Sequence, residues 1–220
     1  MGEENAIHIL YTKISNTLLE EDYKNYLIFL PEPMRAQHFR YRRWQDRRAN
    51  LFSKILLIKG LQRFGYDYQC LEQLKYNEYG RPNLTGDVDF NISHSGEYVL
   101  CGIGKGIQIG IDIEEIKPVD FSDFENLMTK EQWNTIYTSE DPQKSFFRFW
   151  SIKESIIKAD GRGLAMPLND IIITDQVAFY ERKWYLKELP IDERYCANLA
   201  YNLENTLITE EYFDLGKFSR

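Results

Sequence analysis

Two acidic side chains lie on one face of a predicted strand, where they could hold a metal ion. In the stretch 109–114, three isoleucines alternate with Gly110, Asp112 and Glu114, which is the period of a β-strand. The isoleucines would face the core, and the glycine would leave the approach to the two acids open. Like charges on one face repel each other, so a bound cation is favoured, and oxygen ligands suit magnesium. A strand with a solvated acidic face is the alternative.

A third acid lies on the predicted helix 146–159, which Gly161 ends. Trp150, Glu154 and Lys158 follow one another at i, i+4 and i+8, so they share one side of this helix. Glu154 projects from a largely apolar stripe, where a carboxylate is costly unless it is paired or binds a cation. Glu154 could therefore be a third metal ligand, or a base with a raised pKa. A simple ion pair with Lys158 is the alternative.

Two stretches offer groups that bind anions. Six arginines against one acid fall between Arg35 and Arg48, with aromatic residues among them, which suits a phosphate-rich ligand. A solvated helix face would explain the same run of charge. Further on, Ser93 and His94 lie in the segment 93–96, which we interpret as a phosphate-binding loop rich in donors. A structural role for the histidine is the alternative.

The composition restricts the class of protein. The chain has 220 residues, of which 43% are hydrophobic, so it can bury a core in one large domain or two small ones. The net charge of −7 argues against nucleic acid or an anionic membrane as the main partner. Cys70, Cys101 and Cys196 match no metal-ligand spacing, which indicates reduced thiols. No apolar run reaches membrane-spanning length. Reduced thiols favour a cytoplasmic protein, and we also expect a monomer.

Periodicity predicts a mixture of helices and strands. Helices are expected over 18–30, 51–64, 123–137 and 146–159, and strands over 6–12, 97–103, 109–115, 171–174, 179–186 and 194–201. Each half of the chain runs through strands, a long helix and further strands. The pattern therefore predicts an α+β protein, and it is compatible with an internal duplication.

The motifs together resemble a known enzyme family. Residues 109–114, followed after a gap by residues 149–158, are similar to the two-part signature of the 4'-phosphopantetheinyl transferases of the longer, surfactin-synthetase type. Residues 79–82 and 90–95 resemble further patterns of that family, in the same order. The resemblance implies an α+β pseudo-dimer of two similar halves, 1–104 and 107–220, with the active site at their interface.

The resemblance also implies a reaction. Enzymes of this family transfer the 4'-phosphopantetheine arm of coenzyme A to a serine of an acyl or peptidyl carrier protein, use magnesium, and release adenosine 3',5'-bisphosphate. Because the partner supplies the serine, this chain needs no nucleophile motif of its own. We therefore expect a transferase of fatty acid, polyketide or nonribosomal peptide biosynthesis, whose partners are coenzyme A and an apo carrier protein.

Carried over to this sequence, the family pattern gives roles to single residues. Asp112, Glu114 and Glu154 would hold magnesium, and Lys158 would stabilise charge on the pyrophosphate, so Glu154 and Lys158 would be the catalytic pair. The residues expected to bind coenzyme A are Arg43, Arg47, Arg81, Ser93 and His94. In the arginine-rich stretch the spacing departs from the family pattern, and Arg43 and Arg47 are our choice for the 3'-phosphate.

Two other functions fit the same residues. A magnesium-dependent phosphodiesterase would use the same carboxylates with water as the nucleophile. A coenzyme A-binding protein would retain the fold and the affinity for coenzyme A but would catalyse no reaction. Intact Glu154 and Lys158 argue against the second alternative, because a buried acid without a function is costly to keep.

Overall fold

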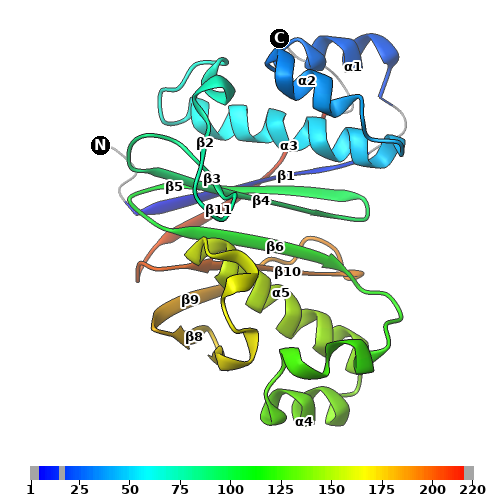
Figure 1. The fold of residues 1–220 in the computed structure, drawn as a ribbon, viewed down its shortest axis with the longest axis vertical. Coiled ribbons are helices and arrows are strands. Elements are labelled where there is room, and N and C mark those ends of the chain that lie inside the picture. The colour runs from blue at the N-terminus through cyan, green and yellow to red at the C-terminus, as the bar shows by residue number, and fades with distance from the viewer. Residues whose placement is uncertain (1–4, 15–17, 216–220) are drawn as a thin grey trace.

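Helices and strands of this chain form four layers. The structure is a computed structural model that describes residues 5–14 and 18–215. Along the long axis of the molecule, a group of helices is followed by one sheet, a second sheet and a second group of helices (Figure 1). Separate buried apolar clusters fill the spaces between the layers. The predicted α+β class is confirmed.

The first sheet is built largely from the N-terminal part of the chain. Its strands, in spatial order, are β11 (Leu207–Tyr212), β1 (Ala6–Lys13), β5 (Tyr98–Lys105) and β4 (Val88–Ser95). Its helices are α1 (Glu20–Leu27), α2 (Glu32–His38) and α3 (Trp44–Gln62). Helix α3 packs on β5, because its apolar residues lie on the side that faces the sheet, and they are buried there. The segment between α3 and β4 holds a short helix, η1 (Cys70–Gln73), and a ribbon of β2 (Lys75–Tyr76) and β3 (Pro82–Asn83).

The second sheet carries the predicted acidic strand at its edge. Its strands, in spatial order, are β6 (Ile109–Glu115), β10 (Tyr195–Tyr201), β9 (Arg182–Glu188), β8 (Val177–Tyr180) and β7 (Ile172–Thr174). Two longer helices and three short ones accompany it, namely α4 (Lys130–Thr138), α5 (Pro142–Asp160), η2 (Phe121–Leu127), η3 (Gly163–Ala165) and η4 (Leu168–Asp170). Helix α5 packs across β6 and β10, so the predicted helix lies directly against the predicted acidic strand.

The ends of α5 follow from local chemistry. The Asp141 side chain accepts a hydrogen bond from the Lys144 N–H, and Pro142 occupies the first helical turn, where its missing N–H costs nothing. Gly161 ends the helix in the left-handed conformation, with φ of 90°. The predicted end of this helix is confirmed, whereas it begins four residues earlier than its apolar spacing predicted.

A ladder of side chains joins the two sheets where β4 lies beside β6. Both strands are sheet edges, so the outward N–H groups of β6 need acceptors from elsewhere. Alternate side chains of β4 supply them. The pairs of N–H donor and side-chain acceptor are Ile109 with Asp89 (2.8 Å), Ile111 with Asn91 (3.0 Å), Ile113 with Ser93 (3.4 Å) and Glu115 with Ser95 (3.1 Å). This ladder fixes the register between the sheets.

The last strand returns to the first sheet. Strand β11 pairs in parallel with β1, from Ala6 with Leu207 to Tyr11 with Tyr212. A strand from the expected C-terminal half, 107–220, thus belongs to the sheet of the expected N-terminal half, 1–104. Neither β11 nor its pairing with β1 is among the elements that periodicity predicts.

Four sequence predictions need correction. The predicted single helix 123–137 is two helices, the 3₁₀ helix η2 and α4, because the backbone is extended at Met128 and Thr129. Ser93 and His94 lie within β4 and not in a loop, because β4 continues to Ser95 before the turn at Gly96. The predicted single strand 179–186 is a hairpin of β8 and β9, with Glu181 at φ of 56° in the turn. Helix α3 extends back to Trp44 and so takes in part of the arginine-rich stretch.

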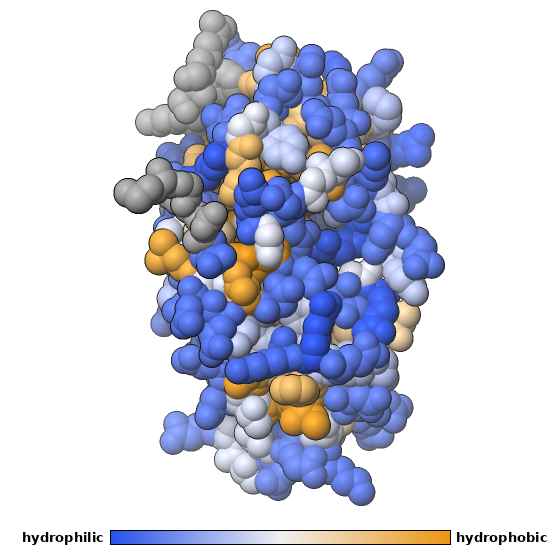
Figure 2. All heavy atoms as spheres, turned by 90° about the vertical axis from the view of Figure 1, so that its left-hand side faces the viewer, coloured by the Kyte–Doolittle hydropathy of each residue, from blue (hydrophilic) through white to orange (hydrophobic). Residues whose placement is uncertain are grey.

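The surface and the thiols agree with the composition. Figure 2 shows one face of the molecule, which is mainly hydrophilic with small separate apolar areas. Cys70, Cys101 and Cys196 are free and buried. Within residues 5–14 and 18–215, we find no helix both long and apolar enough to cross a membrane.

Candidate active site

The two acids of β6 lie on the face that α5 covers. The isoleucines on the opposite face are fully buried between the sheets, as predicted. Asp112 is only 2% exposed, so a solvated acidic face is excluded for this residue. Gly110 has a different role from the one predicted. A Cβ there would overlap the carbonyl oxygen of Ser155 and the N–H of Ala159, so the glycine lets the backbone of α5 lie against β6.

Asp112 is at the centre of a small polar cluster. Its Oδ1 accepts hydrogen bonds from the Lys158 ammonium at 2.5 Å and from the Ser93 hydroxyl at 2.9 Å. Lys158 also donates to the Ser93 hydroxyl oxygen at 3.0 Å. The cluster therefore joins β4, β6 and α5, which are three separate elements. Lys158 forms its ion pair with Asp112. The alternative prediction, an ion pair between Lys158 and Glu154, is therefore not what the structure shows.

Glu114 is held by two donors beside this cluster. The indole N–H of Trp150 donates to its Oε1 at 3.1 Å, and the Ser95 hydroxyl donates to its Oε2 at 3.3 Å. Burial raises the pKa of the Glu114 carboxyl, and the nearby Asp112 charge acts in the same direction. The hydrogen bond of Trp150 was not predicted from the sequence, although the spacing of Trp150 from Glu154 places both on one side of the helix.

Glu154 completes the group of acids. Burial raises the pKa of its carboxyl, the charges of Asp112 and Glu114 raise it further, and the Lys158 ammonium lowers it. The charges of Asp112, Glu114 and Lys158 thus all act on the Glu154 carboxyl. Helix α5 achieves this because Glu154 and Lys158 lie one turn apart on the side that faces β6.

One oxygen of this group fits a cation. Asp112 Oδ2 is buried and has no hydrogen-bond partner, which is costly unless something else satisfies it. Carboxylate oxygens are the ligands that magnesium prefers. Among the residues that the structure describes, no three His, Cys, Asp or Glu side chains are grouped closely enough to hold a metal ion. The donor chemistry therefore fits magnesium, while the three-carboxylate set stays a prediction.

The predicted phosphate-binding residues fall in different places. His94 lines a cavity of about 320 Å³, and burial lowers its pKa, as does the charge of Lys158. The other residues that line this cavity are Tyr41, Asp46, Asn50, Ser53, Lys54, Pro82, Asn91 and Ile92. Ser93 is buried instead, and its hydroxyl donates a hydrogen bond to Asp112.

The arginines are not gathered at this cavity. Neither Arg43 nor Arg47 is among the described residues that line it. Arg47 contacts a residue of the cavity wall, because its Nε donates a hydrogen bond of 2.7 Å to the carbonyl of Tyr41. Arg81 is half-buried elsewhere, with its guanidinium bonded to Asp89 and to backbone carbonyls. Their predicted contacts with coenzyme A stay predictions.

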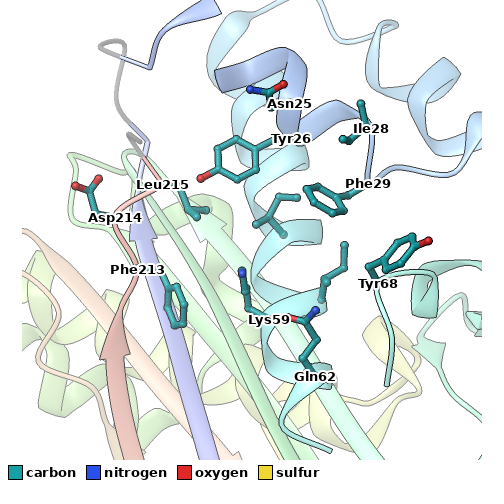
Figure 3. A pocket seen from close by; sticks show the side chains of 12 residues that line it. Asn25, Tyr26, Ile28, Phe29, Lys59, Gln62, Tyr68, Phe213, Asp214 and Leu215 are labelled. Atoms are coloured by element: carbon teal, nitrogen blue, oxygen red, sulfur yellow. The ribbon is translucent and has the colours of Figure 1, made fainter. Parts of the chain in front are cut away.

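A second cavity lies away from the acids. It has a volume of about 530 Å³ and lies between the end of α1, helix α3 and the segment after β11 (Figure 3). Aromatic side chains such as Tyr26, Phe29 and Phe213 form much of its wall. None of the predicted catalytic or metal-binding residues lies there, so the candidate site is the polar cluster between β4, β6 and α5.

The chain is similar in sequence to known proteins. The family model described as 4'-phosphopantetheinyl transferase superfamily matches residues 108–207. The 4'-phosphopantetheinyl transferase gsp of Aneurinibacillus migulanus is 31% identical over 93% of this chain and 91% of its own length. The chain belongs to the 4'-phosphopantetheinyl transferase superfamily. The chain is also similar to the 4'-phosphopantetheinyl transferase Sfp of Bacillus subtilis, with 29% identity over 71% of each chain. The 4'-phosphopantetheinyl transferase ffp of Bacillus subtilis is 27% identical over 85% of this chain and 83% of its own length.

Membership confirms the resemblance and the enzyme class predicted from the motifs. The chain is a 4'-phosphopantetheinyl transferase, and the matched region includes the acids of β6 and the whole of α5. The polar cluster is thus formed by one residue outside the matched region, Ser93, and by residues within it, Asp112 and Lys158.

Proposed function

We propose that this transferase moves the 4'-phosphopantetheine arm of coenzyme A to a serine of an acyl or peptidyl carrier protein, with magnesium, and releases adenosine 3',5'-bisphosphate. The observation that carries the proposal is the cluster at the junction of the two sheets. There Lys158 pairs with Asp112, and the charges of these two residues act on the half-buried carboxyls of Glu114 and Glu154. Such a mixture suits a pyrophosphate that is held and cleaved.

The reaction needs one bond formed and one broken. The serine hydroxyl oxygen of the carrier attacks the phosphorus on the pantetheine side of the pyrophosphate. The bond from that phosphorus to the bridging oxygen breaks, and the leaving group is adenosine 3',5'-bisphosphate. Glu154 accepts the serine proton, and Lys158 donates hydrogen bonds to phosphate oxygens as negative charge shifts to the leaving group.

The acids need a cation because they face an anionic substrate. When bound, magnesium supplies positive charge that neutralises the pyrophosphate, and Asp112, Glu114 and Glu154 are the residues that would hold it. Ser93 keeps Asp112 and Lys158 in place through its three hydrogen bonds. His94, beside it on the wall of the 320 Å³ cavity, binds the phosphates of coenzyme A.

Mass spectrometry of a carrier protein tests the proposal. An apo acyl or peptidyl carrier is incubated with this protein, coenzyme A and magnesium, and the expected result is a carrier that gains the mass of one phosphopantetheine group. Free 4'-phosphopantetheine without a change in the carrier would instead indicate a phosphodiesterase. Binding of coenzyme A with neither product would indicate a non-catalytic binding protein.

We further propose that residues 1–104 and 107–220 are two related halves that work as one cytoplasmic monomer. Each contributes an edge strand to the junction, β4 from the first and β6 from the second, and each packs one long helix, α3 or α5, on its sheet. The active site lies where the two edges meet. Sedimentation of the purified protein gives its oligomeric state.

A further inference from the structure

The cavity beside His94 contains a lysine without a counter-ion. Lys54 lies on α3 and lines this cavity of about 320 Å³, with its side chain half-buried. Among residues 5–14 and 18–215, none forms a hydrogen bond or an ion pair with the Lys54 ammonium. Burial lowers the pKa of this ammonium, because positive charge away from water is costly. An anion bound in the cavity would offset that cost.

Other polar groups on the wall of this cavity suit an anion as well. The Asn50 Oδ1 lies 3.2 Å from the His38 Nδ1, so the Asn50 amide nitrogen is left as a donor. Burial is the main reason why the pKa of His94 is lowered, and the charge of Lys54 adds to the effect. Asp46, the one carboxylate among the described lining residues, acts on His94 in the opposite direction. An ammonium, an imidazole and an amide donor in one cavity match a phosphate group.

The geometry of β4 indicates which phosphate this would be. Coenzyme A carries a pyrophosphate and a separate 3'-phosphate, and the proposed transfer cleaves the pyrophosphate beside Lys158. Ser93 and His94 are neighbours on β4, so their side chains point to opposite faces of the strand. Ser93 faces the polar cluster, whereas His94 lines the cavity. A phosphate in the cavity is therefore the one that does not react. The charge of Lys158 still acts on His94, so a single ligand can reach both places.

We infer that Lys54 binds the 3'-phosphate of coenzyme A, and that it thereby makes the protein prefer coenzyme A to dephospho-coenzyme A. Arg43 and Arg47, the choices made from the sequence, are not among the described residues that line the cavity, whereas Lys54 is. Its position in an otherwise apolar stretch of α3 gave no sign of this role. The inference rests on the proposed function, which decides the phosphate that stays intact.

Calorimetry of Lys54→Met with two ligands tests the inference. Methionine keeps an unbranched apolar side chain and removes the ammonium. We expect the dissociation constant for coenzyme A to rise at least about tenfold, because a charge-assisted hydrogen bond to phosphate is lost. For dephospho-coenzyme A, which lacks the 3'-phosphate, it should stay within about twofold. Lys59→Met is the matched control, since Lys59 is a half-buried lysine of the same helix that lines the other cavity, and it should bind both ligands as wild type does.

The comparison of variants and ligands is a double-mutant cycle in which the 3'-phosphate is the second group removed. Equal losses of affinity for both ligands in Lys54→Met would overturn the inference, because Lys54 would then act on a part that the two ligands share, or on the shape of the cavity. Unchanged affinity for coenzyme A would overturn it too. In that case, a loss confined to coenzyme A in Arg43→Met or Arg47→Met would assign the 3'-phosphate to the arginine-rich stretch instead.

Binding decides the question even if the wild-type protein transfers nothing. A wild-type preference for coenzyme A that Lys54→Met abolishes would support the inference, and lack of transfer would then count against the proposed function alone. Equal wild-type affinities for the two ligands would overturn the inference and leave the proposed function intact. Adenosine 3',5'-bisphosphate and adenosine 5'-monophosphate are a second pair of probes that differ only in the 3'-phosphate, and Lys54→Met should weaken binding of the first alone.

Discussion

The two oxygens of the Asp112 carboxylate have different surroundings. Oδ1 accepts from both Lys158 and Ser93, whereas Oδ2 is buried without a partner. A purely structural ion pair would leave no reason for the second oxygen to stay unsatisfied, since burying it costs free energy. Oδ1 therefore holds the lysine, and Oδ2 is the oxygen through which Asp112 would bind the proposed magnesium ion.

Asp112→Asn is the sharpest test of this carboxylate, because it removes the charge and keeps the shape. We expect transfer to an apo carrier to fall at least about a hundredfold, since a magnesium ligand contributes several kcal/mol of charge stabilisation. Alanine is a poorer choice, because Asp112 is buried and the loss of its carboxylate would leave Lys158 unpaired. The rate is measured by mass spectrometry of the carrier over a range of magnesium concentrations.

The control is Asp87→Asn, which changes an exposed acid that pairs only loosely with Lys105. It should transfer at the wild-type rate and melt at the wild-type temperature. Wild-type rates for Asp112→Asn at limiting magnesium would remove this residue from the metal site.

His94→Ala should mainly raise the KM for coenzyme A. The imidazole lies on the wall of the 320 Å³ cavity and not in the polar cluster, so it would grip a part of the ligand that does not react. Steady-state kinetics with coenzyme A and with dephospho-coenzyme A locate the contact. A smaller effect with dephospho-coenzyme A points to the 3'-phosphate, and a fall in kcat without a change in KM would contradict a binding role.

His38 makes stability depend on pH. It is fully buried, with Tyr23 at Nε2 and Asn50 at Nδ1, and burial lowers its pKa while the Arg47 charge adds to the effect. In the unfolded chain His38 binds a proton near pH 6.5, whereas in the folded chain it does so only at lower pH. The contribution of His38 to the free energy of unfolding is therefore complete above about pH 6.5 and is lost as the pH falls. In urea titrations, His38→Gln should lose less stability than wild type between about pH 7 and about pH 5. Parallel losses would show that His38 titrates freely.

At the scale of elements, the periodicity of the sequence predicted the strand that carries the acids, but not its contacts with α5 and β4. The alternation of 109–114 correctly placed the isoleucines in the core and Asp112 on the other face, because side-chain direction in a strand is a local property. Why Gly110 is a glycine could not be predicted, since the answer is the backbone of α5, which lies more than forty residues away in sequence. Ser93 looked like a loop residue because its partners on β6 and α5 lie 20 and 65 residues away in sequence.

Gly110→Ala tests the close packing of helix and strand. The added Cβ would overlap backbone atoms of Ser155 and Ala159, which cannot move aside as a side chain can. We expect a loss of about 3 kcal/mol or more in the free energy of unfolding, at the upper end for overpacking. Gly60→Ala is the matched control, because its Cβ would meet only the Ile103 side chain, at 3.0 Å, and alanine favours a helix. Equal unfolding free energies for the two variants would contradict this account.

At the scale of the molecule, the two halves are connected at both their edges and their ends. The ladder from β4 to β6 supplies acceptors for one sheet from the other, and β11 adds a strand from late in the chain to the sheet of β1. Neither connection could be predicted from the sequence, because polar residues on an edge strand and a short C-terminal strand carry no local sign of a distant partner. The polar cluster lies at the first of these connections, where β4 supplies Ser93 and β6 supplies Asp112.

This arrangement predicts that the molecule unfolds as one unit. Leu57 is fully buried on α3 in the N-terminal core, so Leu57→Ala should lower the unfolding free energy by about 2–5 kcal/mol. If the junction couples the halves, amide exchange in β10, in the other sheet, should show the same loss of protection. Lys24→Ala, which removes an exposed side chain on α1, should change neither value measurably. Unchanged protection of β10 in Leu57→Ala would mean that the halves unfold independently, and that the cluster between them forms only when two separately stable parts dock.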